Sequence, residues 1–98
     1  MKVYIKLHNK PSGQVIAVCD ADLLGKVIKT KKLSINVSTG FYKGELISIE
    51  EAINILKNAS NFNIIGSNII AAVVRNKIIP DTAILKINNI PLAMKFII

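Results

Sequence analysis

The chain has 98 residues, of which 51% are hydrophobic and 19% charged, and its formal net charge is +7. This length predicts one domain over residues 1–98, and so apolar a composition excludes an intrinsically disordered segment. The longest uninterrupted apolar stretch, 69–74, is far shorter than the roughly 20 residues that span a bilayer, and no signal-peptide pattern is present. The one cysteine fits a reducing compartment, so we expect a soluble, cytoplasmic protein without membrane contact.

The excess of basic residues permits nucleic-acid binding but also has a simpler explanation. Twelve of the thirteen basic residues are Lys, and the chain contains 19 Ile and 10 Asn. Codons for Lys, Ile and Asn are rich in A and T, so a genome biased toward these bases would give the same profile. Arginine recognises phosphate and guanine better than lysine does, and Arg75 is the single arginine. The charge alone therefore leaves both explanations open.

The first twenty residues predict an antiparallel hairpin. Apolar and polar residues alternate over 1–8, which indicates a half-buried strand, and a second apolar run covers 14–20. Turn-forming residues fill 9–13 between them. A five-residue loop there pairs His8 with Gln14 and Val3 with Cys19, and this register places Cys19 among the apolar residues of the first strand as a core residue.

The segment 20–44 predicts a short helical turn, a strand and a loop. Asp20 is the expected cap of a turn over 21–24, and four lysines follow within 26–32. Alternation over 33–37 predicts a third strand. The following loop, 39–44, contains two adjacent aromatic residues between Gly40 and Gly44.

The second half of the chain predicts two helices and a closing hairpin. Ser48 and Glu51 form a capping box that starts a helix over 49–59, and 62–65 predicts a short strand or an extended link. Ser67 is the expected N-cap of a second helix that ends near residue 77. Strands over 84–87 and 91–98 pair around Asn88–Asn89. The order of elements predicts an α+β fold with an N-terminal β-hairpin, a third strand, two helices and a C-terminal β-hairpin.

The sequence offers little support for enzymatic chemistry. His8 and Cys19 are the candidates for a thiol–imidazole pair, but the predicted register separates them by about 16 Å. One His and one Cys do not supply the three or four ligands of a zinc site, and Asp20 with Asp22 lacks the further ligands and the glycine of a calcium loop. We therefore expect no catalytic residue, no metal and no cofactor.

Two segments are candidates for ligand binding. Gly66 and Ser67 lie at a helix N-terminus, where free N–H groups bind anions, although a simple capped turn explains the same residues. The 40–44 loop places aromatic rings beside lysines, a combination that stacks on unpaired bases, unless Phe41 or Tyr42 folds back into the core. This loop and the lysines of 26–32 lie at the two ends of the predicted strand 33–37, about 20 Å apart, and would form one basic edge. The residues expected to contact RNA are Lys29, Lys31, Lys32, Phe41, Tyr42 and Lys43.

Five short motifs follow one another over nearly the whole chain: Val18-Cys19-Asp20, Leu23-Leu24-Gly25, Phe41-Tyr42-x-Gly44, Asn63-Ile64-Ile65-Gly66 and Ile90-Pro91. In this order they resemble an uncharacterised archaeal family known only as domain of unknown function number 424. The resemblance implies a cytoplasmic archaeal protein with no established activity, whose relatives are encoded near genes of translation initiation and ribosome maturation. In that family the closing proline is followed by His, Ala and Gln. Here Leu92, Ala93 and Met94 stand at these positions, so a polar site of the family there would be lost.

These observations predict a non-enzymatic accessory protein that contacts RNA or a ribonucleoprotein of the translation machinery through the basic, aromatic-bearing edge. The alternative is a protein–protein interaction module or a homodimer that uses an exposed apolar patch, because half of the residues are hydrophobic. Salt discriminates between the two, since RNA binding weakens steeply with ionic strength and apolar association does not.

Overall fold

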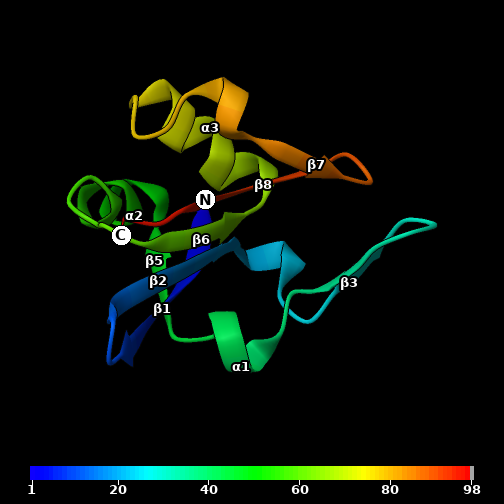
Figure 1. Ribbon diagram of the computed structural model, residues 1–98, viewed down its shortest axis with the longest axis horizontal. Helices are drawn as coiled ribbons and strands as arrows, with labels where there is room; N and C mark the ends of the chain where they lie inside the picture. Colours follow the sequence, from blue (N-terminus) through cyan, green and yellow to red (C-terminus); the bar gives the residue numbers. More distant parts are fainter. Residues whose placement is uncertain (98) are drawn as a thin grey trace.

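The fold is α+β, as the sequence predicts, and is built on a six-stranded sheet with the strand order β5-β1-β2-β6-β8-β7. The computed structural model describes residues 1–97 (Figure 1). The strands of the sheet are β1 (Lys2–Lys10), β2 (Gly13–Asp20), β5 (Glu45–Ser48), β6 (Phe62–Ile65), β7 (Leu85–Ile87) and β8 (Ile90–Lys95). The other elements are the strands β3 (Val27–Lys29) and β4 (Ser34–Asn36), the helices α1 (Thr39–Tyr42), α2 (Ile49–Leu56) and α3 (Ser67–Arg75), and two 3₁₀ turns, η1 (Ala21–Leu23) and η2 (Asp81–Ala83).

The large sheet consists of two antiparallel halves joined by a parallel pair. In the N-terminal half β1 pairs with β2 and β5, and in the C-terminal half β8 pairs with β6 and β7. The halves meet where β2 runs parallel to β6, which is the one parallel pair within residues 1–97. Parallel strands need a long crossover, and here it contains β3, β4, α1, β5 and α2.

Helices α2 and α3 cover one face of the sheet and bury the larger part of the core. Both helices are amphipathic, so one side of each is apolar and packs on the strands. The residues at the centre of this core are fully buried: Val3, Val18, Leu56, Phe62, Ile64, Ile69 and Val73. Removal of these apolar side chains from water stabilises the packing of α2 and α3 on the sheet.

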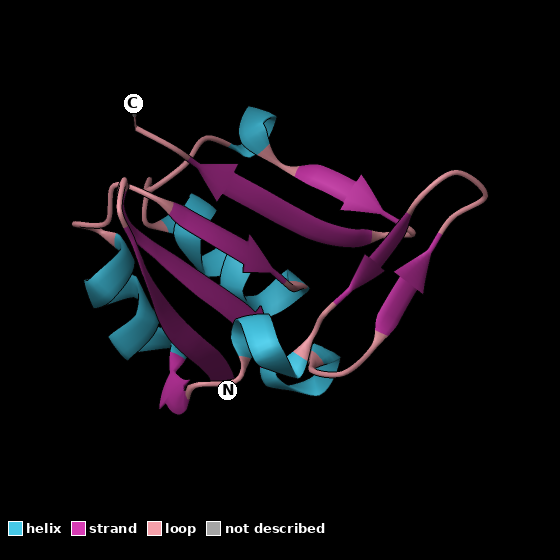
Figure 2. Ribbon diagram, turned by 60° about the horizontal axis from the view of Figure 1, so that its bottom comes forward, coloured by secondary structure: helices cyan, strands magenta, loops and turns pink. Residues whose placement is uncertain are grey.

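The other face, which we call the open face, is covered only in part. The β3–β4 hairpin forms a separate two-stranded sheet that lies beside the β7–β8 hairpin, as Figure 2 shows. Together with η1 and α1 it encloses a second apolar cluster, made of Ala17, Cys19, Leu23, Ile28, Val37, Tyr42, Ile65 and Leu92. The strand predicted over 33–37 is confirmed for residues 34–36 as β4, which pairs with β3 and does not join the large sheet.

The register of the first hairpin differs by one residue from the prediction. Lys10 pairs with Gly13, so the turn contains two residues and not five, and His8 faces Val15. A shift of one residue moves each side chain of β2 to the other face relative to β1. Cys19 consequently pairs with Tyr4 and not with Val3. It is fully buried, as expected, but in the cluster of the open face.

Asp20 caps a different helix from the one predicted. Its side chain makes no hydrogen bond to η1, which follows it in the chain. Instead its carboxylate accepts hydrogen bonds from the backbone N–H groups of Asn68 (2.8 Å) and Ile69 (2.9 Å) in the first turn of α3. The N-cap position of α3 is Gly66 and not Ser67, because a carboxylate from β2 supplies the acceptor that Ser67 was expected to provide.

Gly66 is required at the start of α3 for two reasons. Its φ of +128° lies in a region that residues with a Cβ rarely adopt. A Cβ on this residue would also overlap the carboxyl group of Asp20. The chain therefore turns from β6 into α3 at a position that only glycine fills without displacing the cap.

Ser48 is confirmed as the N-cap of α2, with Glu51 at the N3 position. The Ser48 hydroxyl accepts a hydrogen bond from the Glu51 N–H (3.1 Å) and lies 3.3 Å from the Glu51 carboxylate. The helix ends at Leu56, three residues before the predicted end. The loop predicted over 39–44 contains α1, which Ser38 caps, and the following strand β5 was not predicted.

The closing hairpin is also confirmed. Asn88 and Asn89 both have positive φ, and Ile87 pairs with Ile90 across the turn. Asparagine tolerates this left-handed conformation better than most residues, so the turn is encoded locally. Strand β8 ends at Lys95, and the end of the predicted strand at residue 98 lies outside the described residues.

Ser48→Ala is expected to lower the free energy of unfolding by about 1 kcal/mol, because it removes the acceptor that satisfies the first turn of α2. Urea unfolding measures the effect. Ser60→Ala, at an exposed serine outside the helices, is the control and should leave the midpoint unchanged. Equal midpoints for both variants would mean that the cap does not stabilise α2.

Gly66→Ala is expected to cost about 3 kcal/mol or more, because it combines backbone strain with loss of the charged cap on α3. Gly13→Ala is the matched control, since Gly13 has the same φ of +128° but an added Cβ would meet only the Asn61 side chain at 3.8 Å. The difference between the two variants in urea unfolding measures the overlap with Asp20. Equal losses would contradict the assigned role of Gly66.

Candidate nucleic-acid interface

Strand β1 presents a row of polar and basic side chains on the open face. Tyr4 packs against the second apolar cluster, and alternate residues of a strand share a face, so Lys6, His8 and Lys10 lie on the same side as Tyr4. Lys6 donates a hydrogen bond from its Nζ to the carbonyl oxygen of Gly40 in α1 (2.8 Å). This contact joins the basic strand to the segment that carries the two aromatic residues.

Phe41 is held in a fixed orientation by its neighbours. Its ring stacks on the His8 ring, with centroids 4.7 Å apart and planes inclined by 17°, and it meets the Tyr42 ring edge-on at 4.9 Å. The His8 Nε2–H donates to the Phe41 carbonyl oxygen (2.8 Å). Ser38 caps this turn by accepting a hydrogen bond from the Phe41 N–H (3.1 Å). The half-buried Phe41 ring is therefore a rigid part of the surface.

Tyr42 belongs to the core and not to the surface. Its side chain is 5% exposed, and its hydroxyl donates to the Asn63 Oδ1 (2.8 Å). Burial raises the pKa of Tyr42 to about 12, so the phenol stays protonated and remains a donor. Because no face of the ring is free to stack on a base, Tyr42 is removed from the predicted RNA-contacting set. Of the two aromatic residues, it is the one that fills the core.

An open cavity of about 580 Å³ borders the Phe41 ring on the open face. Its walls come from the β1–β2 turn, β2, α1, the start of β6 and the residues after β8. The lining residues are Lys10, Ser12, Gly13, Val15, Phe41, Asn61, Asn63, Phe96 and Ile97. Phe96 and Ile97 are also 61% and 59% exposed. The cavity thus combines apolar and aromatic walls with amide and ammonium groups, and its volume lies in the range of small-molecule sites.

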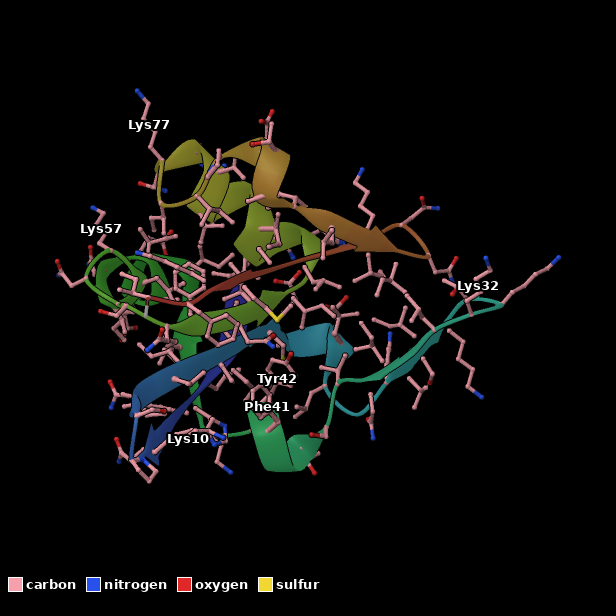
Figure 3. All side chains as sticks on the ribbon, in the orientation of Figure 1. Lys10, Lys32, Phe41, Tyr42, Lys57 and Lys77 are labelled. Carbon is pink, nitrogen blue, oxygen red and sulfur yellow. The ribbon has the colours of Figure 1, made fainter. Side chains whose placement is uncertain are left out.

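The predicted lysines do not form one edge with the aromatic residues. Lys29, Lys31 and Lys32 lie at and beside the turn of the β3–β4 hairpin, whereas Lys43 directly follows α1. Figure 3 shows Lys32 at the projecting end of this hairpin, away from Phe41 and Tyr42. The structure instead brings Phe41 close to Lys6, His8 and Lys10 of β1, which the sequence interpretation had not assigned to a site.

The sequence carries a partial signal for these three residues of β1 and for Asn63. The alternation in β1 places Lys6, His8 and Lys10 on one face, but the predicted register gave no reason to connect them with the 40–44 loop. Asn63 is the one polar residue in the apolar run of β6, which marks it as a side chain with a specific partner. That partner, Tyr42, is 21 residues earlier in the chain, so only the fold identifies it.

The candidate anion site at Gly66 and Ser67 already contains a carboxylate. The N–H groups of Asn68 and Ile69, which would bind an anion, donate to Asp20, and Asp20 is 3% exposed. Burial raises the pKa of this carboxyl above its ordinary value of 3.8, while the two hydrogen bonds act in the opposite direction. The helix N-terminus therefore serves the fold, because its N–H groups already have an acceptor within the protein.

The residues after the closing proline lie on both faces of the sheet. Leu92 and Ala93 are buried, and Met94 pairs with Asn63 and is 47% exposed. Leu92 belongs to the apolar cluster of the open face, and Ala93 belongs to the core beneath the helices. Met94 therefore adds exposed apolar surface beside Asn63.

The described residues bring together neither a thiol–imidazole pair nor a set of metal ligands. Cys19 pairs with Tyr4 and His8 with Val15, so the thiol and the imidazole lie well apart along the hairpin. Within residues 1–97, no three His, Cys, Asp or Glu side chains gather in a way that could hold a metal ion. None of the helices in this part of the chain has the length and hydrophobicity that a bilayer crossing requires.

Comparison with known proteins identifies the family. Residues 8–98 match the family described as "Protein of unknown function (DUF424)". The chain belongs to this family. This match confirms the resemblance seen in the five sequence motifs, and no curated protein matches the chain.

A solved structure has the same fold. It is the crystal structure of an uncharacterized conserved protein from Methanopyrus kandleri, an archaeal organism, and it has a TM-score of 0.84 to this chain at 23% sequence identity. The match covers 96% of this chain and 90% of that one. At this identity the likeness establishes the fold alone.

Cys19 is expected to be unreactive toward a water-soluble thiol reagent in the native protein. It is fully buried, and burial raises the pKa of its thiol from 9.0 to about 11, which reduces the thiolate fraction about 100-fold at neutral pH. Labelling should be at least about 100-fold slower than in urea-unfolded protein at the same pH. Labelling of native protein at the unfolded rate would show that the open-face cluster does not protect the thiol.

Proposed function

We propose that this protein is a non-enzymatic accessory protein that contacts RNA, or a ribonucleoprotein of the translation machinery, through the open face and the β3–β4 hairpin. The observation that carries the proposal is the uneven distribution of charge along the fold. Eight of the thirteen basic residues but only two of the six acidic residues precede Gly44, and one of those two, Asp20, is buried. This segment builds β1, β2, the β3–β4 hairpin and α1, which are the elements around the open face.

A concentration of lysines on one side favours binding to a polyanion. Phosphate contacts by lysine release counterions and do not depend on sequence, so such binding is weakened by salt and tolerates many sequences. Lys6 and Lys10 on β1 and the lysines of the hairpin supply positive charge at two places around the same face. The half-buried Phe41 ring between them adds a surface for base stacking.

The translation context rests on the family resemblance. The resemblance implies relatives that are encoded near genes of translation initiation and ribosome maturation, and such a context favours an RNA or a ribonucleoprotein over DNA as the polyanion. The proposal places the protein in the cytoplasm, where this machinery works. It assigns no catalytic residue and no cofactor.

A second candidate function is a protein–protein contact or homodimer. The observation in its favour is the exposed apolar surface at the end of β8, where Met94, Phe96 and Ile97 are 47%, 61% and 59% exposed. Contiguous exposed apolar residues often mark an interface. Such an association would persist at high salt, which distinguishes it from RNA binding.

The combined substitution Lys29→Gln, Lys31→Gln and Lys32→Gln should weaken binding to single-stranded RNA. If all three lysines contact phosphates, the slope of log affinity against log salt should fall in magnitude by about 2. A fluorescence titration with a labelled oligoribonucleotide at several salt concentrations measures both quantities.

The matched control replaces Lys57, Arg75 and Lys77 with Gln, which removes the same charge from the helix-covered side. Figure 3 shows Lys57 and Lys77 on the side of the molecule away from Phe41. The control should retain the wild-type slope. If both triple variants bind like the wild type, or both lose the same affinity, the proposed interface is wrong. Salt-resistant dimers in size-exclusion chromatography would favour the second candidate.

A further inference from the structure

The cavity beside Phe41 has walls of three chemical kinds. Phe41, Val15, Phe96 and Ile97 supply aromatic and aliphatic surface, Asn61 and Asn63 supply amides, and Lys10 supplies an ammonium group. A purely apolar ligand would leave the Asn63 Nδ2 and the Lys10 ammonium group without partners, which costs free energy when these groups are desolvated. A ligand with a flat ring, polar edges and an adjacent negative charge would satisfy all three.

The Phe41 ring is preorganised to stack. The His8 ring stacks on it, the Tyr42 ring packs at nearly a right angle to it, and the His8 Nε2–H bonds to the Phe41 carbonyl oxygen. A rigid aromatic side chain loses little conformational entropy when a ligand covers it. The part of the ring that borders the cavity is therefore a favourable surface for a second flat ring.

The two asparagines differ in what they offer a ligand. Asn61 uses both ends of its amide, because its Oδ1 accepts from the Ile97 N–H (2.9 Å) and its Nδ2 donates to the Gln14 carbonyl oxygen (3.4 Å). Asn63 uses its Oδ1 to accept a hydrogen bond from the Tyr42 hydroxyl (2.8 Å), which leaves the Nδ2 at the other end of the amide for a ligand. The Asn63 Nδ2 is thus the amide donor available at the cavity wall.

Charge identifies the class of ligand. Lys10 lines the cavity, Lys6 lies on the same strand face, and the cavity borders the half of the chain that carries most of the positive charge. An uncharged aromatic compound would not use this charge, whereas a nucleotide carries phosphate next to its base. The volume of about 580 Å³ accommodates a group of this size.

We propose that this cavity binds one unpaired nucleobase of single-stranded RNA. The base stacks against Phe41, a base acceptor receives the Asn63 Nδ2–H, and the neighbouring phosphate lies at Lys10. This inference rests on the proposed function, because it specifies how the RNA is held, and it adds a base-binding site to an otherwise electrostatic contact.

The test compares two probes on the wild-type protein. The first is hexauridylate, and the second is the hexamer of the same backbone without bases. Hexauridylate is expected to bind about 5- to 150-fold more tightly than the abasic hexamer, which is the gain in affinity from stacking one base. The slope of log affinity against log salt should be the same for both probes, because their phosphates are the same. In NMR spectra, hexauridylate but not the abasic hexamer should shift the Asn63 side-chain amide signal.

The variant Phe41→Leu should remove the difference between the probes, because leucine keeps apolar volume but offers no ring. Leu7→Ala is the control, since Leu7 is 53% exposed on the opposite face of β1, and it should preserve the difference. The comparison of probes on the wild type needs no variant and therefore stands even if Phe41→Leu unfolds the protein.

The outcomes separate the two levels of the proposal. If neither probe binds, the proposed RNA function fails. If both bind with equal affinity and equal salt slope, the RNA contact stands and the base-binding site is wrong. If Phe41→Leu folds normally and still prefers hexauridylate, the base binds elsewhere and the assignment of this cavity is overturned.

Discussion

The architecture depends on the seam where β2 and β6 run parallel, and the buried carboxylate of Asp20 secures one end of it. Each half of the sheet is otherwise antiparallel and internally paired, so the seam alone joins the N-terminal strands to the C-terminal strands within residues 1–97. Asp20 ends β2 and binds the first turn of α3, which starts directly after β6. Gly66 allows this close approach, and its N–H donates to the Pro91 carbonyl oxygen (2.9 Å), which connects β8 to the same point.

A second interaction crosses the seam on the other face. Tyr42 from the N-terminal half donates to Asn63 of the C-terminal half, and the burial that keeps the phenol protonated also preserves this hydrogen bond. The two crossings have different consequences. The Asp20 cap is buried and stabilises the fold, whereas Asn63, which accepts the Tyr42 hydrogen bond, also lines the cavity.

Incomplete coverage of the open face creates the candidate site. The β3–β4 hairpin and α1 lie over one part of that face (Figures 1 and 2). The part beside the β1–β2 turn borders the cavity. The lysines of β1 share this face because strand residues alternate. The Phe41 ring, Lys6 and Lys10 are therefore combined on one sheet surface, while Lys32 lies at the projecting end of the β3–β4 hairpin, away from Phe41 (Figure 3).

Local interactions explain what the sequence by itself determined. The Ser48–Glu51 capping box, the Asn88–Asn89 turn and the alternation of β1 each involve residues within a few positions of one another, and all three were predicted. Together with the order of elements they determined the α+β class. The five motifs also identified the family, which the match over residues 8–98 establishes.

Only the tertiary structure decided the one-residue register of the first hairpin, because a two-residue turn and a five-residue loop are both compatible with the same residues. It also decided that Asp20 caps a helix 48 residues away, that the strand at 34–36 leaves the large sheet, and that Tyr42 is buried while Phe41 stays at the surface. Each of these outcomes depends on a partner distant in sequence, and local propensity carries no information about such partners.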